Sequence, residues 1–132
     1  MQNDTISSIM NTKFASIPSS MLVVEASKEL IKSEALGGVV LDDDGKLQGW
    51  ISEQDCLQVI IQVAYHNQRV AGVSDIMKTD VLSVSPDQTI LSIAEKMSGP
   101  QPKNYPVVDQ NGNVVGIVTR REVIKYLLAH TK

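Results

Sequence analysis

The sequence predicts a mixed α/β fold (α+β) made of two tandem β-α-β-β-α repeats with pseudo-two-fold symmetry. An ungapped alignment of the 132-residue chain with itself, at an offset of about 67 residues, gives two groups of identities. Each half also contains a glycine turn between two short apolar runs. We therefore divide the chain into repeat 1 (residues 1–66) and repeat 2 (residues 67–132), which together form one module. The identities pair Ser7, Ile9, Met10, Thr12, Ser16, Val40, Asp42, Gly45 and Gly49 with Ser74, Ile76, Met77, Thr79, Ser83, Val107, Asp109, Gly112 and Gly116.

Each repeat begins with a short apolar run and then an amphipathic stretch. We expect the runs to be strands and the stretches to be helices. Ser20 and Asp87 precede the helical stretches and are residue types that accept hydrogen bonds from first-turn amides, so we predict them as N-caps. The predicted strands are residues 14–17 and 81–84, and the predicted helices are residues 21–33 and 88–97.

A hairpin and a second helix complete each repeat. Residues 38–41 and 46–51 flank the turn DDDG, and residues 105–108 and 113–118 flank DQNG, in which glycine supplies the positive φ of a tight turn. The following helices are apolar over most of their circumference, since Gln58 and Gln62 are the only polar residues from 56 to 65 and Lys125 is the only charge from 123 to 129. Such helices need cover on more than one side. We predict a homodimer through residues 54–66 and 121–130; the alternative is that the two helices pack only on each other.

The composition limits the function. Hydrophobic residues make up 42% and charged residues 20% of the chain, with a net charge of −3, which argues against disorder and against a nucleic-acid binder. The single Cys56 cannot form an internal disulfide or a multi-thiolate zinc site, which fits a reducing, cytoplasmic setting. No apolar stretch approaches the length of a membrane span, so we expect no membrane partner.

The motifs resemble a CBS-domain pair, the Bateman module. The resemblance covers residues 4–130 and is strongest in SDIMKTDVLSVSPDQTI (74–90) and NYPVVDQNGNVVGIVTRREV (104–123). It implies a regulatory module without chemistry of its own. Clefts between the two repeats would bind an adenosine-containing ligand (AMP, ADP, ATP, NAD or S-adenosylmethionine), no cofactor would be required, and a separate effector protein would respond. Repeat 1 departs from the pattern, because Val39, preceded by Gly37 and Gly38, replaces the strand proline.

The family's binding signature carries over onto the start of each second helix. In GWISEQD the Ser52 hydroxyl would meet phosphate and Asp55 would hold the ribose hydroxyls. In GIVTRRE, Thr119 matches the hydroxyl and Glu122 stands where the family most often has aspartate. The predicted ligand-binding residues are Ser52, Asp55, Thr119, Arg120, Arg121, Glu122, Tyr105, Pro106, Gly38 and Val39.

These residues also have a structural interpretation. Ser52 with Asp55, and Thr119 with Glu122, both approximate the capping box of a helix start, which needs no ligand. Arg120 and Arg121 occupy a first turn, where positive charge opposes the helix dipole unless an anion sits there. We therefore expect ligand phosphates near residues 119–121 and a ribose at Asp55, not necessarily in one molecule. The alternative is that both arginines are solvated surface residues.

Other candidate sites have less support. The carboxylates of DDDG lack the order of an EF-hand loop, and the matching DQNG turn favours a hairpin. His66 and His130 lack partners at ligand spacing, so we predict no metal site, and Cys56 is expected to be a packed thiol. Trp50 belongs to the core or faces a dimer partner. Without a nucleophile–base pair or a phosphate loop the chain is not predicted to be an enzyme. The competing function is a constitutive dimeric adaptor with vestigial nucleotide clefts.

Overall fold

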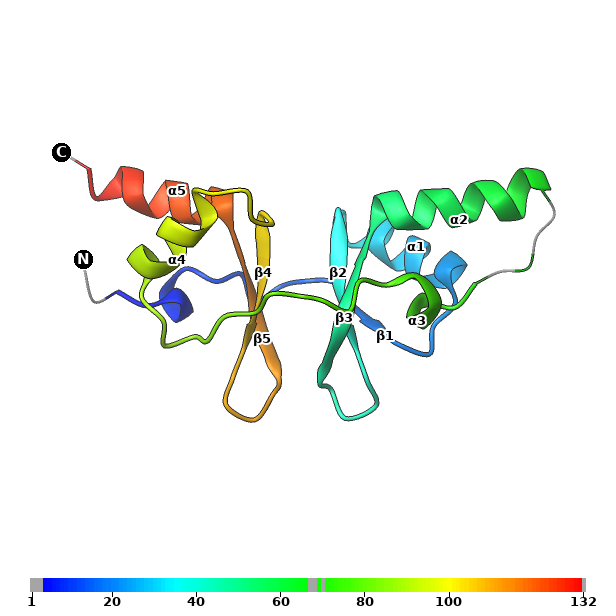
Figure 1. Ribbon diagram of the computed structural model, residues 1–132, viewed down its shortest axis with the longest axis horizontal. Coiled ribbons are helices and arrows are strands. Elements are labelled where there is room, and N and C mark those ends of the chain that lie inside the picture. The colour runs from blue at the N-terminus through cyan, green and yellow to red at the C-terminus, as the bar shows by residue number, and fades with distance from the viewer. Residues whose placement is uncertain (1–3, 67–68, 70, 132) are drawn as a thin grey trace. The chain divides into compact units, whose positions relative to one another are not determined.

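The computed structural model describes residues 4–66, 69 and 71–131, and these residues form two compact units (Figure 1). The central unit is Phe14–Val81. The terminal unit combines the chain up to Lys13 with the chain from Leu82 onward. The start of each sequence repeat therefore packs in the unit that contains the other repeat's hairpin. The division of the repeats after residue 66 stays a prediction, because the compact units follow packing and not sequence similarity.

The central unit contains β1 (Ser16–Pro18), α1 (Val23–Lys32), β2 (Gly37–Leu41), β3 (Leu47–Ser52), α2 (Glu53–His66) and α3 (Val73–Ile76). Strand β2 lies in the middle of the sheet, parallel to β1 and antiparallel to β3. The free edge of β3 is covered by the segment after α3, because the amides of Trp50 and Lys78 each donate to the other's carbonyl at 2.9 Å. The segment that leads into repeat 2 thus completes the sheet of repeat 1.

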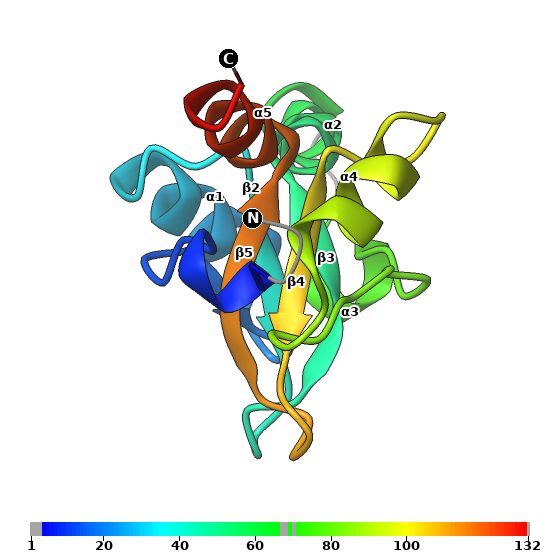
Figure 2. The same cartoon turned by 90° about the vertical axis from the view of Figure 1, so that its left-hand side faces the viewer.

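The terminal unit contains a short 3₁₀ helix, η1 (Ile6–Ser8), followed by α4 (Ile90–Met97), β4 (Asn104–Val108), β5 (Val114–Thr119) and α5 (Arg120–Ala129). Strands β4 and β5 are antiparallel. The predicted strand at 81–84 is only a single parallel bridge between Val84 and Val107. Asn11 and Ile117 exchange backbone hydrogen bonds of 2.8 and 2.9 Å, and Figure 2 shows the N-terminal segment beside β5. The same exchange of leading segments therefore occurs in both units.

The predicted N-caps Ser20 and Asp87 are wrong, and the exchanged segments explain why. Helix α1 begins after Leu22 without a side-chain cap, because the amide of Val23 donates to the carbonyl of Ala71 at 2.9 Å. The amide of Ile90 likewise donates to Asp4, and Thr89 caps α4 by accepting from Ser92. Backbone carbonyls from a distant segment thus satisfy first-turn amides, and each helix begins two residues later than the sequence predicts.

Both predicted hairpins are confirmed, with strand ends within one residue of the predicted ones. Gly45 and Gly112 have φ of 80° and 85°, which favours glycine at these turns. Asp42 Oδ1 accepts from the amides of Asp44 and Lys46, both at 2.9 Å, and Asp109 makes the equivalent pair of bonds. The carboxylate of DDDG therefore closes a turn, and the described residues contain no acidic, histidine or cysteine group fit to hold a metal.

Each unit has its own apolar core, and each core contains a buried side chain from the exchanged segment. Ile6 and Val73 are both fully buried in these cores. Cys56 is 4% exposed in the core of the central unit, which confirms the packed thiol. The central core further includes Ile17, Val23, Ala26, Leu30, Val40 and Ile51, and the terminal core includes Ile90, Ile93, Met97, Tyr105, Val107, Val118 and Val123.

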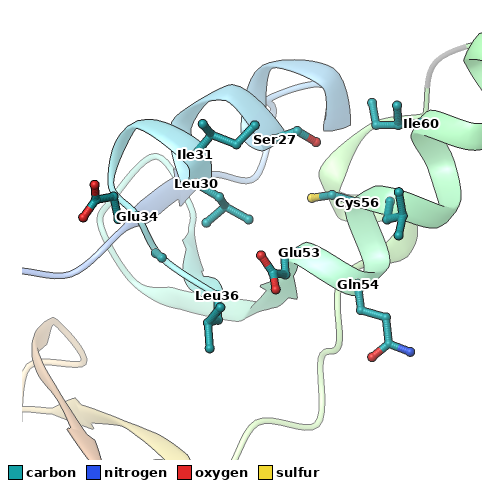
Figure 3. Close-up of a pocket in the computed structure, with 11 residues that line it drawn as sticks. Ser27, Leu30, Ile31, Glu34, Leu36, Glu53, Gln54, Cys56 and Ile60 are labelled. Atoms are coloured by element: carbon teal, nitrogen blue, oxygen red, sulfur yellow. The ribbon is translucent and has the colours of Figure 1, made fainter.

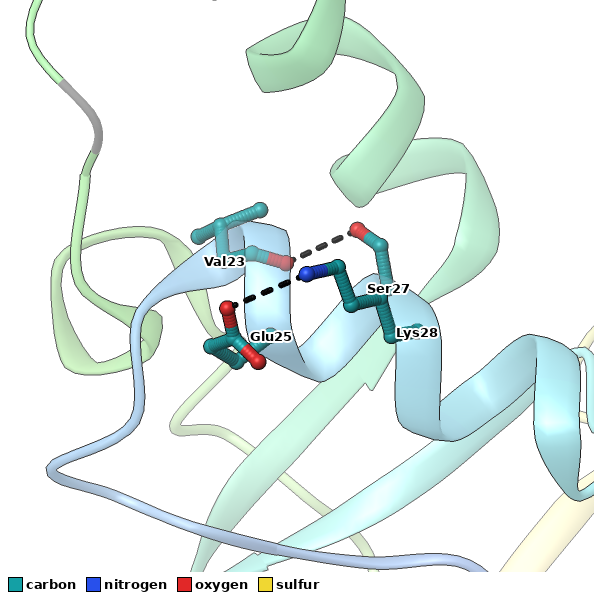
Figure 4. A network of polar contacts seen from close by, with 4 residues as sticks. All are labelled: Val23, Glu25, Ser27 and Lys28. Atoms are coloured by element: carbon teal, nitrogen blue, oxygen red, sulfur yellow. Dashed lines mark hydrogen bonds and ion pairs between the residues drawn. The ribbon is translucent and has the colours of Figure 1, made fainter.

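Polar side chains of α1 make contacts within the helix itself. Ser27 Oγ donates to the carbonyl of Val23 at 2.8 Å, and Lys28 Nζ lies 3.4 Å from Glu25 Oε1 (Figure 4). Both charged side chains are exposed, so the pair contributes little to stability. Among the described residues, no helix has the length and apolar character needed to cross a membrane.

Candidate functional site

The candidate site in repeat 1 lies on the side of the hairpin that faces away from the core of the central unit. Side chains alternate along a strand, so Val40 and Ile51 enter the core while Val39, Trp50 and Ser52 take the opposite side. We call this side the non-core face. Val39 is fully buried and Trp50 is half-buried outside the core cluster, which excludes the core interpretation of Trp50.

Trp50 explains why a glycine precedes Gly38. A Cβ built on Gly37 would lie 2.8 Å from the Trp50 ring, so only glycine lets the indole cross β2 at this point. Gly37 pairs with Ser52 in the ladder, which brings the indole close to the start of α2. The non-core face of repeat 1 thus combines an aromatic ring with a hydroxyl at a helix start.

Ser52 and Asp55 form a complete capping box at that helix start. Asp55 Oδ2 accepts from the amide of Ser52 at 3.2 Å and from its hydroxyl at 2.9 Å, and the amide of Asp55 donates to Ser52 Oγ at 3.1 Å. Among the described residues no donor bonds to the other carboxylate oxygen, Oδ1. The structural role and a ligand role are therefore compatible, because one oxygen serves the cap while the other is free to accept.

In repeat 2 the equivalent helix start carries different side chains. Pro106, Ile117 and Thr119 occupy the non-core face of the β4–β5 hairpin, because their neighbours Val107 and Val118 enter the core. Thr119 Oγ1 accepts from the amide of Glu122 at 3.1 Å. The carboxylate of Glu122 lies 3.9 Å from Lys125.

The two arginines at the start of α5 are adjacent in the sequence, but their surroundings differ. Arg120 Nη2 donates to the carbonyl of Gln101 at 2.8 Å, while its Nε is buried without a hydrogen-bond partner. Arg121 is exposed, and no described residue pairs with its guanidinium. Its amide is also one of those for which helix geometry provides no intrahelical acceptor. Arg121 is thus the free cation at this helix start, whereas Arg120 mainly fastens the loop before β4.

The remaining predicted residues take part in packing. Tyr105 is 2% exposed in the terminal core, so its side chain lies on the core side of β4. A Cβ built on Gly38 would lie 2.9 Å from the carbonyl oxygen of Ala15, so glycine lets the chain before β1 approach β2. The structure therefore brings together Val39, Ser52 and Asp55 in one unit and Pro106, Thr119 and Arg121 in the other.

One polar contact that the sequence did not predict ties the N-terminal segment to α5. The Tyr126 hydroxyl donates to Asp4 Oδ2, and partial burial together with the Asp4 carboxylate raises the pKa of Tyr126 to about 12. The His130 ring lies 4.2 Å from the Tyr126 ring, and its Nδ1 lies 2.8 Å from the Tyr126 carbonyl oxygen. No local sequence signal marks a contact between residues so distant in the chain.

Comparisons with known proteins agree on one family. A family model described as CBS domain matches residues 6–62 and again residues 73–129. An uncharacterised protein of Methanocaldococcus jannaschii is 31% identical, and the match covers 74% of this chain and 76% of that protein. The homoserine O-acetyltransferase of Methanohalobium evestigatum is 25% identical over 92% of this chain, but the match spans only 24% of that enzyme.

Solved structures give the same result. The CBS domain pair of protein MJ0100, in complex with 5′-methylthioadenosine and S-adenosyl-L-methionine, has a TM-score of 0.77 and 27% identity, covering 96% of this chain and 98% of that one. The cytosolic domain of the Mg²⁺ channel MgtE, in complex with ATP, has a TM-score of 0.80 and 26% identity, covering 93% of this chain and 48% of that one.

Proposed function

This chain belongs to the CBS-domain family, and we propose that it is a regulatory module that binds an adenosine-containing ligand and catalyses no reaction itself. Two of its structural relatives carry such ligands, S-adenosylmethionine with methylthioadenosine in one and ATP in the other. The match to the acetyltransferase is confined to a quarter of that enzyme, which favours a regulatory role for the shared part.

The observation that carries the proposal is the geometry of Asp55. Its Oδ2 is fixed by two donors from Ser52, and its Oδ1 is free at the edge of the non-core face. A carboxylate held in this way is suited to accept hydrogen bonds from a pair of ribose hydroxyls. Binding then costs little conformational entropy, because the side chain is already ordered. The half-buried Trp50 offers apolar surface on the same face for a base.

Phosphate binding is assigned to repeat 2. Arg121 is exposed and unpaired at the first turn of α5, where the helix dipole also favours an anion. Glu53 and Asp55 give the equivalent turn of α2 the opposite charge, which disfavours phosphate there. A ligand with a ribose and no phosphate is thus expected to prefer repeat 1, and AMP, ADP or ATP to require repeat 2.

The second candidate function is an adaptor with vestigial clefts, and the capping box favours it. Ser52, Asp55 and Thr119 all make hydrogen bonds within the protein, so the local structure is complete without a ligand. A thermal-shift series with AMP, ADP, ATP, NAD and S-adenosylmethionine separates the two functions, because a bound ligand raises the unfolding midpoint by mass action. The sensor predicts a saturable rise for at least one ligand, and a flat response to all five supports the adaptor.

The same proposal includes a homodimer, a separate effector protein and a cytoplasmic location. Leu57 and Tyr65 on α2 and Leu128 on α5 are exposed apolar side chains within the predicted contact ranges 54–66 and 121–130. Ligand binding at the starts of these helices would alter the contact between chains, and the effector would respond to that change. Light scattering during size-exclusion chromatography tests the dimer, which is expected at twice the chain mass of 14.4 kDa.

A further inference from the structure

The exchanged segment that completes the sheet of the central unit also places a lysine on the non-core face of repeat 1. Trp50 and Lys78 lie directly opposite each other in an antiparallel bridge, and each amide donates to the other's carbonyl. Side chains of such a pair lie on the same side of a sheet. Met77, the preceding residue, packs against the central core beside Gly49, as the alternation of side chains requires. Lys78 therefore lies beside the indole, on the face that carries Ser52.

The ammonium group of Lys78 is available to a ligand. Its side chain is exposed, and no described residue makes an ion pair or hydrogen bond with the ammonium group. Trp50 and Ser52 are two residues apart along β3, a distance of about 7 Å. Ser52 in turn fixes Asp55 through the capping box. The non-core face of repeat 1 thus presents a cation, an aromatic ring and a carboxylate with a free oxygen on neighbouring positions.

Negative charge surrounds the carboxylate end of this face. Glu53 is exposed in the same helical turn as Asp55, and Figure 3 shows its side chain at the groove between α1 and α2. Glu34 lines the same groove, and neither glutamate has an ion-pair partner among the described residues. Unpaired carboxylates act on other charges within a Debye length, about 10 Å at 0.1 M salt. A phosphate next to the ribose is therefore disfavoured here, and a positive group in the same place is favoured.

The equivalent face of repeat 2 has different side chains at the same two positions. Its exchanged segment places Asn11 opposite Ile117. A neutral amide thus replaces the ammonium group of Lys78, and an aliphatic side chain replaces the indole of Trp50. The charge offered at this helix start is the exposed guanidinium of Arg121, with which no described residue pairs. Repeat 1 therefore offers charges of both signs to a ligand, whereas repeat 2 offers a cation.

We propose that the site of repeat 1 takes a nucleoside with a zwitterionic amino-acid tail, as in S-adenosylmethionine, and that Lys78 binds the carboxylate of that tail. The inference rests on the proposed function and names the ligand class of one of its two sites. With the ribose held at Asp55, the sulfonium on the 5′ carbon lies near Trp50, whose ring face attracts a cation. The tail then crosses the face to Lys78, where ammonium and carboxylate form a charge-assisted hydrogen bond.

Ligands with and without the tail test the role of Lys78 by calorimetry. S-adenosylmethionine and S-adenosylhomocysteine carry the amino-acid tail, whereas 5′-methylthioadenosine has a methyl group in its place. Lys78→Met should weaken binding of both tailed ligands roughly tenfold and leave methylthioadenosine unchanged, because only the bond to the carboxylate is lost. Lys78→Arg keeps the charge and should restore most of the affinity. Lys32→Met is the matched control, because it removes another exposed lysine of the same unit.

Tryptophan fluorescence locates the binding, since Trp50 is the single tryptophan of the chain. The tailed ligands should change its emission with the dissociation constant that calorimetry gives, and heat without a change in emission would overturn the assignment to repeat 1. If Lys78→Met weakens all three ligands equally or none of them, the role of Lys78 is wrong while adenosine binding stands. If it weakens AMP and not the tailed ligands, Lys78 binds phosphate and the proposal also fails. A parent chain that binds none of these ligands overturns the proposed function itself.

Discussion

The second helix of repeat 1 begins with Glu53 and Asp55, whereas that of repeat 2 begins with Arg120 and Arg121, although both helices follow the same strand and the same capping hydroxyl. The backbone plan is shared, so the difference lies in charge. Repeat 1 presents the free carboxylate oxygen of Asp55, an acceptor, and repeat 2 presents the exposed guanidinium of Arg121, a cationic donor. The two repeats thus share a backbone plan and carry opposite charge at the starts of their second helices.

The largest expected difference between the repeats lies under the exchanged segments. Gly49→Ala would overlap the carbonyl oxygen of Lys78, which belongs to the backbone, whereas Gly116→Ala meets the flexible side chain of Met10, with Sδ 2.8 Å away. Chemical denaturation should show a loss of about 3 kcal/mol for Gly49→Ala and about 1 kcal/mol for Gly116→Ala. Equal losses of stability in the two variants would mean that the segments beside Gly49 and Gly116 move aside equally easily.

The next largest effect concerns phosphate. Arg121→Ala should weaken ATP binding about tenfold and leave adenosine binding unchanged, because only the charge-assisted bonds to phosphate are lost. Lys125→Ala removes a charge from the same helix at a residue already paired with Glu122 and serves as the control. Calorimetry with both ligands measures the split, and equal weakening of both would remove the assignment of phosphate to repeat 2.

A smaller effect is expected where the first helices end. Glu34 has φ of 53° after α1, and none of the other described non-glycine residues, the equivalent Gln101 included, has a positive φ. Glu34→Gly should therefore stabilise the chain by about 0.5–1 kcal/mol, and Gln101→Gly should not stabilise it. Denaturation at concentrations where the chain is monomeric measures both. If Glu34→Gly destabilises the chain, the backbone at Glu34 is not strained.

The smallest effect concerns the N-terminal segment. Tyr126→Phe removes the hydrogen bond to Asp4, so hydrogen exchange of the amides near η1 should become faster, while the exposed Tyr65→Phe changes nothing. The pKa of Tyr126 is raised to about 12, so the neutral phenol is favoured in the folded state. Its contribution to stability is therefore complete below about pH 10 and is lost as the pH rises towards 12. Unchanged exchange in Tyr126→Phe would show that the segment is held by packing alone.

The sequence predicted the repeated plan because its signals are local. Gly45 and Gly112 mark the turns, and the apolar runs 56–65 and 123–129 lie within the observed second helices. The N-cap predictions were wrong because the true hydrogen-bond partners are distant in the sequence. The carbonyls of Ala71 and Asp4 accept from the first amides of α1 and α4. The exchange of leading segments was not predicted, since only spatial contacts such as those of Met77 with Gly49 and Met10 with Gly116 reveal it.

The candidate site was predicted in part for the same reason. Ser52, Asp55 and Thr119 follow from a motif at a helix start and occupy the expected positions. The sequence could not separate Arg120 from Arg121, because the bond from Arg120 to Gln101 spans a loop. It also could not show that Tyr105 enters the core, since burial depends on which side of β4 packs against α4 and α5.

Calorimetric titration of an adenosine ligand into paired aspartate variants tests ribose binding at Asp55 most directly. Asp55→Asn keeps an oxygen that can accept from Ser52 but lowers the strength of a ribose contact, and Asp75→Asn makes the same change at a carboxylate that caps α3 by accepting from Gly72. We expect saturable binding that weakens about tenfold in Asp55→Asn and stays at the parent value in Asp75→Asn. Binding that is absent in the parent, or equal in all three proteins, would contradict it.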